Sequence, residues 1–277
     1  GIITSLDRDG SILDTDKSVW FQGRSGWMFA TLYNTVEKRA EWLEAARSCA
    51  EFSRDHCHGP DGKMDFTVTR GGSPLRMGRY GFAAISYAAL AKASGEANWA
   101  NEAVRCFETY LHHSFTPGVM LAKSLRPMKG IGPLMIGIVT VQELRDNLGD
   151  IAIRGRSCTE WIEHFILEIE RDFFKPDFAV LMETVAPDGS VIDHAEGRTL
   201  NPGHAIECAW FIMQEGHHRN DSRLIALGAQ ILDGMWARGW DTEHGGLFYF
   251  TDLHHGPVQE YWHDMKFWWP HCEAIIA

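Results

Sequence analysis

Residues 200–214 read Leu200-Asn-Pro-Gly-His204-Ala-Ile-Glu207-Cys-Ala-Trp-Phe-Ile-Met-Gln214, and this stretch carries the signals of a helix start. Asn201 can cap the helix with its side-chain oxygen, and Pro202 suits the first turn because it has no N–H that needs a partner. Apolar residues then recur at helical spacing. The pattern predicts a helix that begins near Pro202 and presents His204 and Glu207 on one face at its positively polarised end.

A His and a Glu three residues apart at a helix N-terminus have three common uses. They can act as an acid/base pair, bind a metal, or simply pack against each other. Two other predicted helix starts carry residues of the same kind. Arg24 lies in a glycine-rich and aromatic stretch, where its guanidinium can hold an oxyanion or sugar hydroxyls, or pair with a core carboxylate. His271 and Glu273 follow Trp269 and a proline.

These three helix starts follow a similar pattern. Each comes 14 or 15 residues after a glycine in a predicted hairpin turn, and the pairs are Gly10 and Arg24, Gly189 and His204, and Gly256 and His271. A recurring spacing indicates one supersecondary unit used again, although three instances leave coincidence open. Such units close most simply into a ring of helices. We expect the helix starts that bear Arg24, His204 and Glu273 to converge on one sugar-sized pocket.

Periodicity along the rest of the chain predicts a mainly helical protein. Besides the helix that starts near Pro202, helices are predicted at 17–34, 41–54, 76–94, 97–113, 133–148, 154–174, 222–238 and 263–277. Hairpins are predicted at 1–14, 178–192 and 245–258, and a strand at 64–70. Gly23, Ser25 and Gly26 are predicted to let another segment approach the first helix closely. The loop at Gly130-Ile-Gly132 could cradle phosphate or be an ordinary connection.

Composition bounds the class of protein. The chain has 277 residues, of which 45% are hydrophobic, and we predict a single domain over 1–277. Its formal charge of -11 and the absence of any Lys/Arg run argue against a nucleic-acid partner. The sequence has neither an apolar run as long as a membrane span nor a basic and apolar leader. We therefore expect a cytoplasmic protein without a membrane partner.

The numbers of cysteine, histidine and tryptophan residues narrow the chemistry. Six scattered cysteines without a CxxC pair predict reduced, mostly buried thiols. Fourteen His and eleven Trp suit a pocket for a polar ring, because indole faces stack on sugar C–H surfaces while ring nitrogens reach hydroxyls. A metal would need three or four ligands among the candidates, and HExxH-type spacing is absent, so we predict no metal.

Two reactions on sugars fit these residues, namely glycoside hydrolysis and transfer of a carbon-bound proton. Two carboxylates several ångströms apart would suit glycoside hydrolysis, and the candidates are Glu183, Asp193, Glu196, Glu207 and Glu273. The recurring positions, however, hold Arg24, His204 and His271 rather than carboxylates. Histidine is better suited to moving a carbon-bound proton near neutral pH.

Several segments, taken in order, resemble a known family. They are Val19-Trp-Phe-Gln-Gly-Arg24, Trp27-Met-Phe-Ala30, Phe66-Thr-Val-Thr-Arg70 with Pro74-Leu-Arg76, Asn201-Pro-Gly-His-Ala-Ile-Glu207, Gly245-Gly-Leu-Phe-Tyr-Phe250 and Asp264-Met-Lys-Phe-Trp-Trp-Pro-His-Cys-Glu-Ala274. Over essentially the whole chain this set resembles the N-acylglucosamine 2-epimerase family. The resemblance implies an all-α fold, an (α/α)6 barrel with short β-hairpins at one end, here without the family's first and last helices.

The resemblance also implies roles for individual residues. Arg24 matches the family's substrate-binding arginine and His204 one of its two catalytic histidines, while Glu207 and Glu273 match acidic residues that line its pocket. The other catalytic histidine belongs to a Phe-His-x-x-Arg stretch that this sequence lacks. We therefore predict His204 and Glu273 as catalytic residues, and Arg24, Glu207, Trp269 and His271 as substrate-binding residues. The second base would come from outside this sequence, so we expect little epimerase activity from the chain alone.

The activity that the resemblance implies is interconversion of N-acetylglucosamine and N-acetylmannosamine, by removal and return of the proton at C2 of the open-chain sugar. The alternatives are an aldose–ketose isomerase, a cellobiose 2-epimerase-like enzyme, and an inverting glycoside hydrolase on the same ring of helices. No cofactor is expected for the chemistry itself, and ATP is the allosteric activator that the resemblance suggests. We predict that the protein forms a homodimer. Its other binding partner is expected to be the small-molecule sugar substrate.

Overall fold

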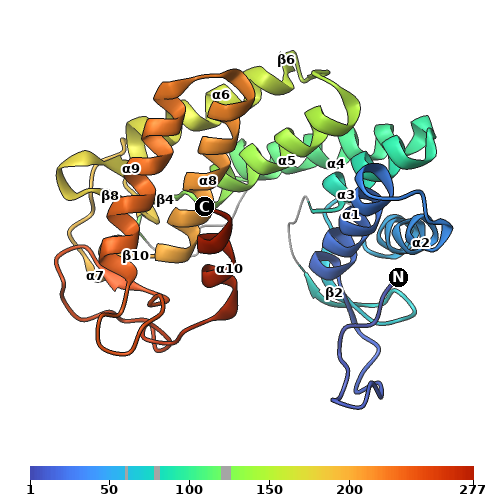
Figure 1. Ribbon diagram of the computed structural model, residues 1–277, viewed down its shortest axis with the longest axis horizontal. Coiled ribbons are helices and arrows are strands. Elements are labelled where there is room, and N and C mark those ends of the chain that lie inside the picture. Colours follow the sequence, from blue (N-terminus) through green and yellow to red (C-terminus); the bar gives the residue numbers. More distant parts are fainter. Residues whose placement is uncertain (60–61, 78–81, 120–125) are drawn as a thin grey trace. The chain divides into compact units, whose positions relative to one another are not determined.

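The computed structural model describes residues 1–59, 62–77, 82–119 and 126–277, and it is mainly α-helical (Figure 1). The helices are α1 Val19–Thr35, α2 Ala40–His56, α3 Phe82–Ser94, α4 Ala97–Phe115, α5 Gly132–Leu148, α6 Cys158–Glu168, α7 Ala195–Arg198, α8 Pro202–Arg219, α9 Ser222–Gly239 and α10 Trp268–Ile276. A π-helical turn, η1 Ile169–Phe173, continues α6, and η2 Pro176–Phe178 is a 3-10 turn. None of the described helices combines the length and apolar character that crossing a bilayer requires.

Every helix predicted from periodicity is present, and most ends differ from the prediction by a few residues. The predicted start at residue 76 is wrong. Residues Pro74–Met77 form strand β3, in which Arg76 pairs with Thr67 of strand β2 Asp65–Val68. The described part of helix α3 spans Phe82–Ser94, and residues 78–81 of the predicted helix lie outside the described residues. Local periodicity did not reveal this strand because its pairing partner, not its own pattern, fixes it.

The chain divides into two compact units. Unit 1 comprises Gly1–Leu121 and Thr140–Glu160, and unit 2 comprises Ala122–Val139 and Trp161–Ala277. The prediction of a single domain over 1–277 stays a prediction, because compact units of this kind can belong to one domain.

In unit 1, α1 packs against α2 and α3. The approach depends on the predicted small residues, since a Cβ on Gly23 would lie 2.7 Å from the carbonyl oxygen of Phe82, and one on Gly26 would overlap the hydroxyl of Ser86. The prediction of a close approach to this helix is therefore confirmed. Strand β1 Lys17–Ser18 pairs with β2 to complete a small antiparallel sheet in the order β1-β2-β3. A second pair in this unit joins β5 Ala152–Ile153 to β6 Arg156–Ser157.

In unit 2, α8 and α9 lie side by side, and α10 packs against α8 (Figure 1). Asn220 ends α8 in the left-handed conformation at φ 53°, and the side chain of Asp221 caps α9. The two helices can approach closely because a Cβ on Gly228 would lie 2.6 Å from the carbonyl oxygen of Ala209. This packing sets the N-terminal half of α8 beside α10.

The short strands of unit 2 form three antiparallel pairs among the described residues, and two of these pairs join segments far apart in the sequence. Their pairs are β7 Phe174–Lys175 with β8 Val180–Leu181, β4 Lys129–Gly130 with β9 Thr184–Val185, and β10 Thr199–Leu200 with β11 Thr251–Asp252. The predicted hairpin at 178–192 keeps its turn, with Gly189 at φ 84°, but its strands pair elsewhere. The hairpin predicted at 245–258 is wrong in the same way, because Thr251–Asp252 pairs with residues 199–200.

The first predicted hairpin is confirmed in a short form. Leu6 bridges Ile12, and Gly10 turns the chain at φ 84°. The recurring hairpin-to-helix unit is therefore present only in part, because Gly256 is not at the tip of a hairpin. Five of the six cysteines are buried, so the prediction of mostly buried cysteines is confirmed, and their reduced state stays a prediction.

Candidate functional site

The start of α8 follows the sequence prediction. The side-chain oxygen Oδ1 of Asn201 accepts a hydrogen bond of 3.0 Å from the main-chain N–H of His204, and Pro202 occupies the first helical position. Asn201 is buried, and its side chain satisfies one of the N–H groups that the first turn of a helix leaves without a partner. The cap fixes His204 in the first turn of α8.

The side chain of His204 meets a carboxylate from a distant part of the sequence. Nδ1 of His204 lies 3.1 Å from both Oε1 and Oε2 of Glu183. Both side chains are partly exposed, at 34% for His204 and 26% for Glu183, so the pair is reachable from solvent. The main chain places Glu183, because its carbonyl accepts a hydrogen bond of 3.0 Å from Ile131 next to the β4–β9 pair.

The environment of His204 shifts its proton affinity. Burial disfavours the imidazolium and lowers its pKa, but the carboxylates of Glu183 and Glu207 more than offset this effect. The pKa of His204 is therefore raised above its ordinary value of about 6.5. A raised pKa makes the imidazole of His204 a stronger base than a free histidine, and an imidazole can both take and give a proton.

Aromatic rings lie against the other side of this pair. The indole of Trp269 and the imidazole of His204 have centroids 5.3 Å apart with planes inclined by 35°. Trp269 reaches this position because Gly203 has no side chain, and a Cβ there would lie 2.6 Å from its ring. Tyr249 meets Trp269 edge to face at 6.0 Å, and burial together with the nearby charge of Glu183 raises the pKa of its hydroxyl.

Glu273 is held by the same pair of helices. Nε1 of Trp210 on α8 donates a hydrogen bond of 2.8 Å to Oε2 of Glu273 on α10. Glu207 lies one turn after His204 on α8, is half-buried, and its charge acts on His204. His204, Glu207, Glu273 and Trp269 thus all belong to the paired helices α8 and α10.

His271 differs from the other predicted site residues. Its Nε2 accepts a hydrogen bond of 3.0 Å from the main-chain N–H of Leu247, and its Nδ1 lies 2.6 Å from the carbonyl oxygen of Phe267, to which it donates. Both ring nitrogens are therefore engaged by the main chain. Its predicted role in substrate binding stays a prediction, and the geometry gives it a structural role in holding the segment around Leu247.

Arg24 lies in unit 1, on α1. Its guanidinium carbon is 4.4 Å from the ring centroid of Phe82 and 5.0 Å from that of Trp20. These cation–π contacts hold the guanidinium close to two aromatic rings. The prediction that Arg24 binds substrate stays a prediction, as does its convergence with His204 and Glu273.

Two residues near His204, Glu183 as its partner and Tyr249 as a neighbour of Trp269, are not identified as such by the sequence. The sequence offers Glu183 only as one of five carboxylates for glycoside hydrolysis, and Tyr249 only as part of a segment that resembles the family. No local spacing links either residue to His204, because the β4–β9 pair and the packing of α10 bring them there. The interpretation of Gly130-Ile-Gly132 as a phosphate cradle loses a donor, since the N–H of Ile131 is bonded to Glu183.

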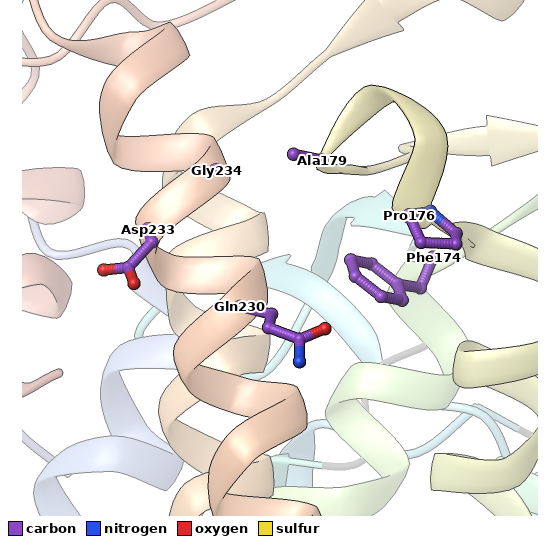
Figure 2. Close-up of a pocket in the computed structure, with 6 residues that line it drawn as sticks. All are labelled: Phe174, Pro176, Ala179, Gln230, Asp233 and Gly234. Carbon is purple, nitrogen blue, oxygen red and sulfur yellow. The ribbon is translucent and has the colours of Figure 1, made fainter.

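Two other kinds of site, a metal site and a surface hollow, are considered for the described residues. In residues 1–59, 62–77, 82–119 and 126–277, no group of three or more His, Cys, Asp or Glu side chains is arranged to hold a metal ion. A surface hollow of about 460 Å³ lies between α9 and the β7–β8 region (Figure 2). It is lined by Phe174, Pro176, Ala179, Gln230, Asp233 and Gly234, none of which is a predicted site residue.

The described fold matches solved enzymes of the (α/α)6 barrel class. A D-mannose isomerase structure aligns with a TM-score of 0.77 at 17% identity, over 99% of this chain and 73% of its own. A cellobiose 2-epimerase from Bacillus thermoamylovorans aligns with a TM-score of 0.80 at 15% identity, again over 99% and 73%. The predicted fold class, a mainly helical (α/α)6 barrel with short β-elements, is confirmed.

Sequence comparison then gives the family. The family model described as N-acylglucosamine 2-epimerase (GlcNAc 2-epimerase) matches residues 1–277. The N-acylglucosamine 2-epimerase of Rattus norvegicus is 34% identical over 296 aligned residues, which cover 100% of this chain and 68% of the relative. The chain belongs to the N-acylglucosamine 2-epimerase family, a family of sugar epimerases and isomerases.

Proposed function

We propose that this protein interconverts N-acetylglucosamine and N-acetylmannosamine, with His204 moving the proton at C2 of the open-chain sugar. The observation that carries the proposal is the setting of His204. Its ring is partly exposed, its pKa is raised by two carboxylates, and it lies beside the indole of Trp269. An indole face suits a sugar's C–H surface, and an imidazole near neutrality suits proton transfer.

The chemistry requires an open ring. In the open form the aldehyde at C1 acidifies the C2–H bond, so a base can remove that proton and leave an enolate. Return of a proton to the same face restores the starting sugar, whereas return to the opposite face inverts C2. We assign one of these proton transfers to His204, with Glu273 and Glu207 as the carboxylates that orient it or the sugar hydroxyls.

Inversion therefore needs a second acid on the opposite face. The family's second catalytic histidine lies in a Phe-His-x-x-Arg stretch, and no such stretch occurs in this sequence. A single base can nevertheless exchange the C2 proton with solvent while keeping the configuration. For the 277-residue chain we expect C2 exchange to exceed inversion, and to occur in the one epimer whose C2–H faces His204.

The experiment follows exchange and inversion separately. The chain is incubated in D₂O with N-acetylglucosamine, N-acetylmannosamine, mannose or cellobiose, and proton NMR records loss of the C2 signal and appearance of the other epimer. Exchange in an N-acetylhexosamine supports the proposal. If neither N-acetylhexosamine exchanges while mannose or cellobiose does, the substrate assignment is wrong, and if no sugar exchanges, the proton-transfer role is wrong.

An aldose–ketose isomerase is the second candidate, because a solved D-mannose isomerase has the same fold. Isomerisation returns the proton to C1 and gives a ketose, which needs a hydroxyl at C2. N-acetylhexosamines have an amide there, so ketose formation from mannose distinguishes the two reactions. A glycoside hydrolase would instead release reducing sugar from an oligosaccharide and leave the C2 proton in place.

Three further features remain proposals, of which the first two follow from the resemblance to the family and the third from the sequence. ATP is proposed as an allosteric activator, the protein as a homodimer, and its location as cytoplasmic. A melting shift on addition of ATP together with a faster C2 exchange would support activation. Sedimentation across a range of protein concentrations tests the dimer, and fractionation of the source cells tests the location.

A further inference from the structure

We propose that Glu183 is a positioning residue that fixes the tautomer of His204, so that Nδ1 always carries a hydrogen and Nε2 is the atom that exchanges protons with the sugar. This inference rests on the proposed function, because it names the atom of His204 through which the C2 proton would move.

The contact itself determines the tautomer. Nδ1 of His204 lies at the same distance, 3.1 Å, from both oxygens of Glu183. An ionised carboxylate only accepts hydrogen bonds, so Nδ1 must donate in both the neutral imidazole and the imidazolium. Only Nε2 can then lose and regain a proton. The same logic orients histidines in metal sites and in hydrolase triads.

Glu183 is held firmly enough for this role. Its carbonyl oxygen is bonded to the N–H of Ile131, and the next two residues form β9 against β4. The first residue of β4, Lys129, makes ion pairs with Glu168 and with the buried carboxylate of Asp172. The strand that follows Glu183 is therefore tied to the helical part of unit 2 by both main-chain and side-chain contacts.

The ring of His204 also packs against an indole. Trp269 packs on the imidazole at 5.3 Å and itself fills the space over Gly203. This packing limits the space in which the imidazole can turn. The contact with Glu183 and the contact with Trp269 thus fix both the orientation and the plane of the imidazole.

The other titratable groups near His204 interact with it differently from Glu183. Glu207 on α8 also raises the pKa of His204, while Tyr249 is a neutral phenol whose own pKa is raised. On α10, Glu273 is bonded to Trp210, and both nitrogens of His271 are bonded to main chain. The group bonded to Nδ1 of His204 is Glu183, whereas Glu207 acts through its charge.

The first test reads the tautomer directly. Nitrogen-15 NMR of the histidine-labelled protein gives the protonation state of each ring nitrogen of His204 across a pH titration, with His204→Asn used to assign the signals. We expect the Nδ1–H form in the neutral state of the wild-type protein. A neutral ring protonated at Nε2 would overturn the proposal, and this result requires no variant of Glu183.

The second test removes the charge. In Glu183→Gln we expect the His204 pKa to fall, the neutral tautomer to become mixed, and C2 exchange to slow by roughly 10- to 100-fold with its acidic limb at lower pH. Glu183→Asp, which restores a carboxylate, should recover part of the rate and of the pKa. Glu243→Gln makes the same charge change at a side chain that is 84% exposed, and it should alter neither value.

The outcomes separate the two proposals. If the wild-type protein exchanges the C2 proton but Glu183→Gln leaves the titration and the pH profile of exchange unchanged, Glu183 has no positioning role. If the wild-type protein shows no C2 exchange with any sugar, the proposed function fails. The tautomer measurement then still decides whether Glu183 positions His204.

Discussion

The indole nitrogen of Trp210 lies 2.8 Å from Oε2 of Glu273, and this hydrogen bond joins α8 to α10 beside the His204–Trp269 contact. The indole N–H has no acceptor function, so it can only donate to the carboxylate. One oxygen of Glu273 is thereby fixed while its side chain stays partly exposed. The bond orients a carboxylate that we propose to act on the sugar.

Trp210→Phe should therefore slow C2 exchange by about tenfold, which corresponds to about 1.4 kcal/mol of lost positioning. The substitution keeps an aromatic ring but removes the donor to Glu273. The initial rate of exchange in D₂O measures the effect. Trp236→Phe serves as the control, because Trp236 on α9 is 41% exposed and stacks only at the surface on Trp240. Equal rates in the Trp210 variant and the wild type would remove Glu273 from the site.

Asn201→Ala should destabilise the protein by about 1 kcal/mol, since the N–H of His204 loses its cap. Urea unfolding followed by circular dichroism measures the difference. Asn201→Ser keeps a capping oxygen and should recover most of the stability. A variant with alanine that is as stable as the wild type would show that the start of α8 depends on packing rather than on this hydrogen bond.

His271→Ala tests whether His271 supports the fold or binds the sugar. Leu247 is fully buried, so its N–H would be left without an acceptor, and we expect a loss of about 1 to 3 kcal/mol in unfolding free energy. Sugar affinity, measured by calorimetry at a temperature where the variant is folded, should change little. His244→Ala is the control, because His244 is 72% exposed. A stable variant with lost affinity would instead support the predicted substrate-binding role.

The raised pKa of His204 predicts how stability depends on pH. A group whose pKa is higher in the folded state binds protons more tightly there, so its contribution to stability is complete below its unfolded pKa of about 6.5. That contribution is lost as the pH rises through the raised folded value. The difference in unfolding free energy between the wild type and Glu183→Gln should therefore shrink from acidic to mildly alkaline pH. A difference that grows over this range would contradict the assignment.

Local signals in the sequence were enough for the helices and for one half of the candidate site. Asn201 and Pro202 specify where α8 begins, and that start places His204, because capping and proline preferences act over a few residues. The small residues Gly23 and Gly26 likewise predicted a close neighbour, which is α3.

The other half of the site depends on contacts between distant segments. Glu183 reaches His204 through the pairing of β9 with β4, and β4 lies more than fifty residues earlier in the chain. Pairing between distant segments also explains the wrong hairpins, because the prediction pairs each short strand with its nearest neighbour in sequence. His271 shows a second limit of sequence-based prediction, which is that contacts with the main chain leave no side-chain pattern. Its position after Trp269 and Pro270 suggested a binding residue, but its partners are main-chain groups that no side-chain pattern reveals.

The most direct measurement compares the wild-type protein with His204→Asn for exchange of the C2 proton of N-acetylglucosamine and N-acetylmannosamine in D₂O. Asparagine keeps a polar side chain but cannot take up a proton at neutral pH. We predict that the wild type exchanges the C2 proton and that the variant is slower by at least roughly 100-fold, the lower range for loss of a general acid/base. Exchange at the wild-type rate in the folded variant would contradict the account.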